Sequence, residues 1–345
     1  MATSNKRRKR HVVGVILIIA GIVSLMYVPW SHLWAWLAPL PDTVQEQVDD
    51  AVDHGLDGII VYVDRAGADP AFYAAGWKNR EQRIPADPRA LFKIASINKL
   101  YIAVAAAKLA SERNVSLDDT LADHFPELVG RIEHADEITL RMMLQHRSGI
   151  PNFIDNPDYP WHDLPKNSRE ALEFALDLPA DFEPGEAYGY SNTNYLLLAE
   201  ALDNVLEQGL DQYIEEKILI PLGLENTFGS LQEVDIDDVM SGYFVGWEPD
   251  LKTSNHGSMI ATAEDVGIFL RALNDGSLLT REEEAIYSTV YVYGHTGSVP
   301  GYSSIARYHA DIDTVVVQFV NTSGGTSWSM TEIVYNRILR ILRRH

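Results

Sequence analysis

Strand-like segments occur near the two ends of this 345-residue chain, and helical patterns fill the stretch between them. Residues 58–67 (GIIVYVDRAG) and 71–77 (AFYAAGW) are typical of two strands joined by a turn. Three more strand-like segments come late, at 289–294, 303–310 and 313–321. Strands from both ends of a chain can share one antiparallel sheet when the middle forms a lobe of its own. The sequence therefore predicts an α/β (α+β) fold, with an antiparallel sheet flanked by helices and an inserted, mostly helical lobe at roughly 115–250.

Helical periodicity surrounds and separates these strands. An early helix is expected at 44–55 and a closing helix at 329–345, where Val334, Ile338 and Leu342 lie on one stripe. The middle of the chain contains four further helical segments, at 138–146, 168–178, 194–209 and 210–219. The segment 92–110 (FKIASINKLYIAVAAAKLA) also reads as an amphipathic helix, and it carries two polar residues in its apolar run.

The N-terminal forty residues have a different composition. Lys6–Arg10 (KRRKR) precedes the uncharged segment 12–28 (VVGVILIIAGIVSLMYV). A helix of that length spans about 25 Å, a little less than the hydrocarbon core of a bilayer. Trp30, Trp34 and Trp36 follow, where an interfacial aromatic belt would lie. The sequence therefore predicts three parts, which are a cytoplasmic basic tail at 1–11, a transmembrane anchor with an interfacial segment at 12–37, and a folded domain at 42–345.

The order of charge and apolar run predicts the orientation of this anchor. Because the basic cluster comes first, the N-terminus should stay in the cytoplasm and the domain should lie outside it, in the periplasm or extracellular space. A cleaved signal peptide is the alternative, but its apolar region is usually about 7–15 residues long and ends in a small-x-small site. Ala35 and Ala38 are spaced wrongly for that site and are flanked by tryptophans. We expect a single-pass protein of the cell membrane with a retained signal anchor.

Composition excludes several classes of function. The net charge is −21 although the basic cluster is included in it, and a surface this acidic argues against a nucleic-acid partner. The chain has no cysteine, so disulfides and thiolate sites are excluded. The histidines are scattered without metal-ligand spacing, and most are expected to be surface or capping residues. No cofactor or metal is predicted, and the sequence does not indicate an oligomeric state.

Ser96 and Lys99 stand three residues apart at the beginning of the 92–110 helix. Residues at i and i+3 are neighbours across one helical turn, so the amine can reach the hydroxyl. A serine needs an adjacent base to act as a nucleophile, and burial would push a lysine toward the neutral form that a base requires. The alternative is a serine helix cap with a surface lysine.

Two further segments offer polar groups that could join this pair. Tyr190 and Asn192 lie in PGEAYGYSNTNY (184–195), a loop before a helix. A tyrosine can relay a proton if cationic neighbours lower its pKa, and an asparagine amide can hold a substrate carbonyl. The alternative for this segment is an ordinary turn that leads into a helix cap.

The segment GHTGSVPGYSS (294–304) contains the remaining candidates. His295 and Thr296 would face a pocket, Gly297 would allow a ligand to approach the backbone, and the N–H of Ser298 could bind an oxyanion. The alternative is a glycine-rich hairpin with an exposed histidine.

Together, the three motifs in this order resemble the serine hydrolases of the penicillin-binding-protein and class C β-lactamase superfamily. The resemblance runs from about residue 57 to the C-terminus and includes LRMMLQHRSGIPNF (140–153) and GSMIATAEDVGIFLRAL (257–273). It implies that Ser96 is acylated and that Lys99 helps to deprotonate it. It also implies that Tyr190 shuttles the proton and that Asn192 orients the substrate amide. His295, Thr296 and Gly297 would line the opposite wall, and the N–H groups of Ser96 and Ser298 would form the oxyanion hole.

His295 departs from the lysine found at this position in many members of that superfamily. A histidine is mostly neutral near pH 7 and would hold a substrate carboxylate less firmly. The expected function is a membrane-anchored hydrolase that cleaves amide or ester bonds in a small-molecule or peptide substrate, which is a D-amino-acid peptide, an ester or a β-lactam. The alternatives are a catalytically weak binding or scaffold protein of the same fold, and an unrelated membrane protein.

Overall fold

The computed structural model describes residues 30–254 and 257–344. The predicted basic tail at 1–11 and the apolar run at 12–28 lie outside these described residues. Among the helices that the structure describes, none is long and apolar enough to cross a membrane.

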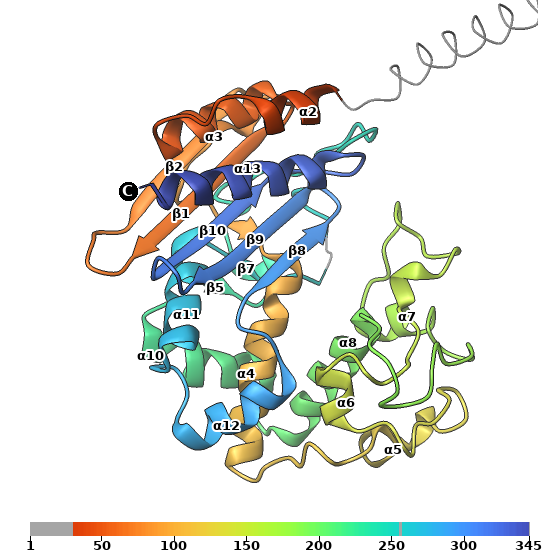
Figure 1. The fold of residues 1–345 in the computed structure, drawn as a ribbon. Coiled ribbons are helices and arrows are strands. Elements are labelled where there is room, and N and C mark those ends of the chain that lie inside the picture. The colour runs from red at the N-terminus through yellow and green to blue at the C-terminus, as the bar shows by residue number, and fades with distance from the viewer. Residues whose placement is uncertain (1–29, 255–256, 345) are drawn as a thin grey trace, which may run out of the picture.

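A six-stranded antiparallel sheet forms the centre of the fold, in the order β3-β2-β1-β10-β9-β8 (Figure 1). Its strands are β1 (Gly58–Arg65), β2 (Ala71–Asn79), β3 (Ile84–Pro85), β8 (His295–Val299), β9 (Tyr302–His309) and β10 (Thr314–Val320). An early strand and a late strand form the central pair of the sheet, where Ile60 of β1 lies opposite Phe319 of β10. The prediction that early and late strands share one antiparallel sheet is confirmed.

The sheet separates two hydrophobic cores because successive side chains on a strand point to opposite faces. Along β1, Ile60 and Tyr62 belong to the larger core, whereas Ile59, Val61 and Val63 belong to the smaller one. Both faces of the sheet are therefore covered, which explains why β1 and β10 are nearly continuous apolar runs.

Three helices cover the face with the smaller core, namely α2 (Trp30–Leu37), α3 (Val44–Asp53) and α13 (Ser327–Leu342). Thr43 and Glu46 form a capping box that begins α3, since each side chain bonds the backbone N–H of the other. Figure 1 shows these helices as a layer above the sheet.

The segment 30–41 belongs to the fold, so the predicted domain start at residue 42 is too late. Ala35 of α2 is buried, and His32 Nε2 lies 2.9 Å from the carbonyl oxygen of Thr326. The buried guanidinium of Arg337 donates to the carbonyl oxygens of Ala38 and Pro39, each at 2.9 Å. Ala38 and Pro39, which lie between the predicted anchor and the predicted domain, are therefore bonded to α13.

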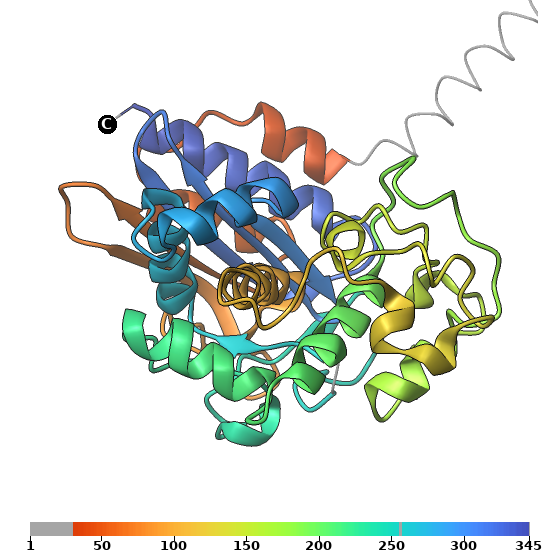
Figure 2. The same cartoon turned by 90° about the horizontal axis from the view of Figure 1, so that it is seen from below.

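Helix α4 (Asn98–Ser111) runs through the larger core, between the sheet and the helical lobe. It is viewed nearly end-on, in gold, in Figure 2. Every residue of α4 from Lys99 to Leu109 is buried. The prediction of an amphipathic helix is therefore wrong, because all sides of α4 are covered. Helices α11 (Ala263–Asp275) and α12 (Arg281–Val290) complete this layer; α11 packs on the sheet, and α12 packs on α4.

The inserted lobe is built of short helices and long loops. Its helices are α5 (Leu121–His124), α6 (Leu140–Leu144), α7 (Ser168–Leu172) and α8 (Asn192–Val205), followed by α9 (Leu210–Ile214) and α10 (Ile220–Leu222). The predicted limit near residue 250 is too late. Residues 227–244 already contribute β5 (Thr227–Phe228) and β6 (Tyr243–Phe244) to small sheets with β4 (Phe92–Lys93), β7 (Ile260–Ala261) and β11 (Thr322–Ser323).

One predicted strand is absent from its expected place. Residues 289–294 (TVYVYG) were expected to be extended, but Val290 ends α12 and the strand begins at His295. The alternation of β-branched and aromatic residues that suggests a strand here reflects packing instead, since Val290 is buried in the larger core and Tyr291 and Tyr293 pack against it.

Candidate active site

Ser96 lies in a 3-10 turn, Ala95–Ile97, that connects β4 to α4. The preceding residue, Ala95, has φ = 52°, a left-handed conformation that is strained for a residue with a side chain. Its N–H donates to Ser258 Oγ at 2.7 Å, which helps to hold this conformation. A strained turn at the beginning of a buried helix places the Ser96 hydroxyl at a fixed point.

Lys99 follows Ser96 by one turn and is 5% exposed. Its Nζ lies 3.4 Å from Ser96 Oγ and 2.8 Å from Asn192 Oδ1. Burial lowers the pKa of Lys99 to about 7, because a charged ammonium loses its hydration there. A substantial fraction of the amine is neutral at physiological pH and able to accept the proton of Ser96.

Tyr190 lies on the other side of the nucleophile. Its hydroxyl donates to Ser96 Oγ at 2.9 Å, although 94 residues separate the two in sequence. Burial raises the pKa of Tyr190 to about 12. Desolvation of the phenolate is the main cause, and it outweighs the lowering of this pKa by the hydrogen bond to Ser96. Tyr190 is therefore a neutral phenol in the resting site and a proton donor.

Asn192 begins α8 and connects Lys99 to the helical lobe. Its Oδ1 accepts from Lys99, and its backbone N–H and Nδ2 donate to Asn152 Oδ1 at 3.0 and 3.3 Å. In this structure the amide oxygen positions the lysine. A role in orienting the substrate amide stays a prediction.

His295 begins β8 and forms the opposite wall with its ring 6.3 Å from that of Tyr190. Its Nδ1 bonds the carbonyl oxygen of Thr296, so this nitrogen carries the proton. Nε2 is then an acceptor, and the Tyr291 hydroxyl lies 2.9 Å from it. Burial lowers the pKa of His295 to about 4, and the ring is neutral at physiological pH.

The remaining residues of β8 bring this strand against the nucleophile turn. A Cβ on Gly297 would lie 2.5 Å from the carbonyl oxygen of Ile94 and 2.4 Å from Ser304 Oγ. The glycine therefore permits close contact between β8 and the Ser96 turn, whereas a close approach of ligand was expected. Thr296 is partly buried and Ser298 is exposed beside it. The oxyanion-hole role of Ser298 stays a prediction.

Two residues near the site were missed from the sequence. His146 was grouped with the surface histidines, yet it is 2% exposed and its ring lies 4.4 Å from that of Tyr190. Its Nδ1 accepts the N–H of Ser191 at 3.3 Å, and burial lowers its pKa to about 3. Tyr291, the partner of His295, was assigned to a strand. The available signal for His146 was its place in the 140–153 segment that carries the family resemblance, and no sequence signal distinguishes Tyr291.

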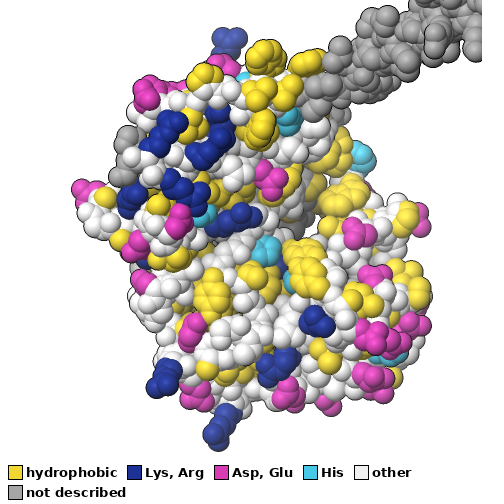
Figure 3. Space-filling model, in the orientation of Figure 1, with side chains coloured by type: hydrophobic (Ala, Val, Ile, Leu, Met, Phe, Trp, Pro, Cys, Tyr) yellow, Lys and Arg dark blue, Asp and Glu magenta, His cyan; other side chains and the backbone are white. Residues whose placement is uncertain are grey.

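The reacting groups come from three parts of the fold: Ser96 and Lys99 from the beginning of α4, Tyr190 from the helical lobe and His295 from the edge of the sheet. Figure 3 shows a hollow between the sheet and the helical lobe on the right of the view. A separate cavity of about 540 Å³ opens at the far end of α4, beside Arg113, Asp119 and Arg141. Arg141 is bonded there to Asp118 at 3.1 Å. The lining residue Ser116 caps a turn with its Oγ, which accepts the N–H of Asp118 at 3.2 Å. Within the described chain, no three His, Asp or Glu side chains gather in a manner suited to a metal ion.

The sequence is similar to those of curated proteins. The chain is 29% identical over 196 residues to Protein flp of Staphylococcus aureus (strain MW2), which is 54% of this chain and 39% of that protein. The chain thus spans about two fifths of the length of this curated relative.

Solved structures share the fold at low identity. The D-amino acid amidase from Ochrobactrum anthropi SV3, solved with L-phenylalanine, superposes with a TM-score of 0.76 at 22% identity, over 87% of this chain and 98% of that chain. A penicillin binding protein from Bacillus halodurans gives 0.71 at 21% identity, over 86% and 98%.

A family model provides the assignment that these low identities do not. The Beta-lactamase model matches residues 41–291, which include the nucleophile turn, the Tyr190 loop and most of the helical lobe. With this match over most of the chain and the shared fold, the chain belongs to the Beta-lactamase family.

Proposed function

We propose that this protein is a serine hydrolase that cleaves amide or ester bonds through an acyl-enzyme on Ser96. The observation that carries the proposal is the meeting of three groups from distant segments. Ser96 Oγ lies 2.9 Å from Tyr190 Oη and 3.4 Å from Lys99 Nζ. A hydroxyl with a proton acceptor on one side and a proton donor on the other is arranged for nucleophilic catalysis.

The geometry supports a balanced sequence of proton transfers. Neutral Lys99 accepts the Ser96 proton as Oγ forms a bond to the acyl carbon of the substrate. The bond from that carbon to the leaving nitrogen or oxygen breaks, and Tyr190 gives its proton to the leaving atom. Lys99 returns a proton to Tyr190. Water then attacks the acyl-enzyme with the same groups as base and acid, and Ser96 regains its hydrogen.

The uncharged side chain of His295 indicates which amides and esters are the better substrates. His295 is uncharged and Tyr291 occupies its Nε2, so this wall offers no ammonium group to a substrate carboxylate. We infer that acyl donors without a free carboxylate, such as D-aminoacyl amides and esters, react faster than peptides ending in a carboxylate. The D-amino acid amidase that shares the fold is consistent with this inference.

We further propose that the protein is attached to the cell membrane by residues 12–28, with the N-terminus in the cytoplasm and the catalytic domain outside it. The support is the sequence pattern of a basic cluster followed by an uncharged apolar run. Fractionation of cells with alkaline carbonate extraction, followed by protease treatment of intact cells, tests both the attachment and the side.

A fluorophosphonate probe tests the catalytic proposal directly. The wild-type protein should be labelled, Ser96→Ala should not, and Ser288→Ala, which removes a hydroxyl on α12, should be labelled like the wild type. No labelling of a folded wild-type protein would contradict the proposal and favour a binding or scaffold role.

A panel of D-phenylalanine amide, p-nitrophenyl butyrate, nitrocefin and a D-Ala-D-Ala peptide tests the substrate class. The amide and the ester should be hydrolysed faster than the peptide. A preference for the peptide with its free carboxylate would contradict the inference from His295.

A further inference from the structure

Helix α2 exposes an apolar stripe at the point where the chain leaves the predicted anchor. Trp30, Trp34 and Leu37 follow an i, i+4, i+7 pattern and are 45%, 64% and 56% exposed. Helix α2 packs on α13, and His32, on the side opposite to this stripe, contacts the carbonyl oxygen of Thr326. Trp36, outside the stripe, is also 60% exposed. Exposed tryptophans in such a stripe are unusual on a surface that faces only water.

The distance to the apolar run limits where this stripe can lie. The uncharged segment ends at Val28, and α2 begins at Trp30. Two residues span at most about 7 Å. If the segment crosses a bilayer, as proposed above, α2 must begin at the membrane interface, where tryptophan side chains are stabilised.

The loop that follows β6 approaches the first turn of α2 through the residues that precede α13. The carbonyl of Thr326, which contacts His32, lies next to Gly325, and a Cβ on Gly325 would be 3.4 Å from Val245. Val245 is 53% exposed, and its N–H donates to the carbonyl oxygen of Ser323 at 2.8 Å.

The same loop reaches the helical lobe across the active-site cleft. The Trp247 ring lies 4.5 Å from that of Phe244 and 4.4 Å from the His162 ring of the lobe. Next to His162, Trp161 is 37% exposed. We call Trp30, Trp34, Leu37, Val245, Trp247 and Trp161 the apolar rim. Figure 3 shows yellow side chains along this side of the molecule, from the top to the hollow.

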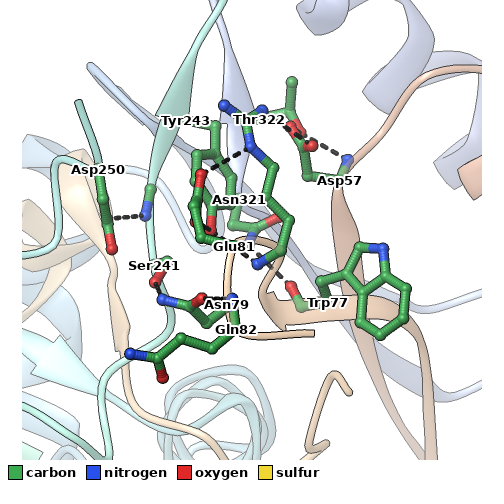
Figure 4. A network of polar contacts seen from close by, with 12 residues as sticks. Asp57, Trp77, Asn79, Glu81, Gln82, Ser241, Tyr243, Asp250, Asn321 and Thr322 are labelled. Carbon is green, nitrogen blue, oxygen red and sulfur yellow. Dashed lines mark hydrogen bonds and ion pairs between the residues drawn. The ribbon is translucent and has the colours of Figure 1, made fainter. Parts of the chain in front are cut away.

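The loop that carries Val245 and Trp247 is fixed at its base by a polar network (Figure 4). Tyr243 Oη donates to Glu81 at 2.6 Å and accepts the backbone N–H of Arg80 at 2.9 Å. Asp250 Oδ1 accepts the N–H of Gly242 at 3.0 Å, which closes the loop. The loop with Val245 and Trp247 is therefore held in a fixed position on the domain.

We propose that the apolar rim rests on the surface of a lipid bilayer, so that the cleft containing Ser96 opens toward the membrane. The exposed tryptophans, the short connection to the anchor and the closeness of the β6 loop to both α2 and the lobe carry this proposal. It rests on the proposed membrane attachment and is independent of the proposed chemistry. An enzyme held in this orientation would take its acyl donor from the membrane surface.

The absence of cysteine allows a direct test on the full chain. Single variants Trp34→Cys, Val245→Cys and Ile220→Cys are labelled with an environment-sensitive fluorophore and reconstituted in phosphatidylcholine vesicles. Ile220 on α10 is the matched control, because it is an aliphatic residue with 65% exposure. Quenching by brominated lipid is compared with quenching by aqueous iodide.

Brominated lipid should quench the Trp34 and Val245 probes at least about twofold more than the Ile220 probe, since interfacial groups lie some 5–10 Å into the boundary region. If the Val245 probe is quenched no more than the Ile220 probe while the Trp34 probe is quenched, the orientation is wrong and the attachment stands. If no probe is quenched, both fail. If lipid does not quench the Val245 probe and its protection from iodide increases with the number of protein molecules per vesicle, a second copy covers the rim and the proposal is wrong. None of these outcomes depends on whether Ser96 reacts with the fluorophosphonate probe.

Discussion

Lys99 places an amine where water has little access, and this decides how Ser96 can react. Lys99 has no carboxylate among its hydrogen-bond partners, which are Asn192 and Ser96. An ammonium group in this position is not neutralised, so the neutral amine is favoured and the pKa falls to about 7. His146 and His295 respond to burial in the same direction, and both are neutral at physiological pH.

The first prediction concerns pH. Below pH 7 Lys99 is protonated and cannot accept the Ser96 proton, and above pH 7 it is neutral. The value of kcat/KM should therefore rise about tenfold per pH unit below about pH 7 and level off above it. Initial rates on p-nitrophenyl butyrate between pH 5 and 9 measure this. A profile that is flat through pH 7 would exclude Lys99 as the titrating base.

The second prediction concerns the Tyr190 hydroxyl. Tyr190→Phe keeps the ring against His146 and removes the group that donates to Ser96 Oγ. Loss of a general acid should lower kcat by about 10²–10⁴ with little change in stability. Steady-state kinetics and thermal unfolding measure the two effects. Tyr308→Phe, at the outer end of β9, should retain wild-type rates, and equal losses in both variants would contradict the role.

At the scale of elements, the contact between β8 and the nucleophile turn determines how close the strand lies to Ser96. β8 is an edge strand that pairs only with β9 in the sheet, and its other side lies against the Ser96 turn. Gly297 makes this contact possible, since a side chain there would meet backbone atoms of Ile94.

The third prediction follows from that contact. Gly297→Ala would place a Cβ 2.5 Å from a backbone oxygen, and overpacking of this kind costs about 1–3 kcal/mol. The strand must move away from Ser96, so kcat/KM should fall together with the free energy of unfolding. Gly294→Ala, whose Cβ would lie 3.0 Å from its nearest neighbour, should have a smaller effect on both. Equal effects at the two positions would contradict the argument. Urea denaturation and ester hydrolysis provide the measurements.

At the scale of the whole molecule, the first described segment and the last helix hold each other in place. Arg337 of α13 is 1% exposed and donates to Ala38, Pro39 and Gln47. Hydrogen bonds from a charged donor contribute about 1.5–3 kcal/mol each, and their loss leaves carbonyl groups without a partner.

The fourth prediction is that Arg337→Gln lowers the free energy of unfolding by about 2–4 kcal/mol through the loss of these bonds. Arg340→Gln, one turn along the same helix and exposed, should change it by less than about 0.5 kcal/mol. Chemical denaturation of both variants at the same pH measures the difference. A similar small change in both would indicate that the 30–41 segment is not held by Arg337.

The fifth prediction concerns truncation. A chain that begins at residue 30 keeps α2 and the bonds to Arg337, whereas a chain that begins at residue 42 loses them and exposes the part of the smaller core that Ala35 and α2 cover. The shorter chain should unfold at a lower temperature, as measured by circular dichroism. Equal unfolding temperatures would show that α2 contributes nothing to the stability of the domain.

Several features of the fold and the site were predictable from sequence because they depend on local chemistry. Apolar, β-branched runs in 58–67 and 313–321 predicted two central strands, and the capping residues Thr43 and Glu46 began α3 where the apolar period predicted a helix. Ser96 and Lys99 were recognisable as a pair because their separation is one helical turn. Tyr190 and His295 were identified through a resemblance between motifs, and their spacing alone could not place them.

The sequence by itself determined which chemical groups are available, since a hydroxyl, an amine and a phenol in short motifs do not depend on the fold. Only the tertiary structure decided their protonation, the closeness of β8 to Ser96 and the attachment of residues 30–41 to α13. The physical reason is that desolvation and close packing are properties of the surroundings. The burial of Lys99 and Tyr190, and the contact of Gly297 with Ile94, come from segments many residues away in the chain.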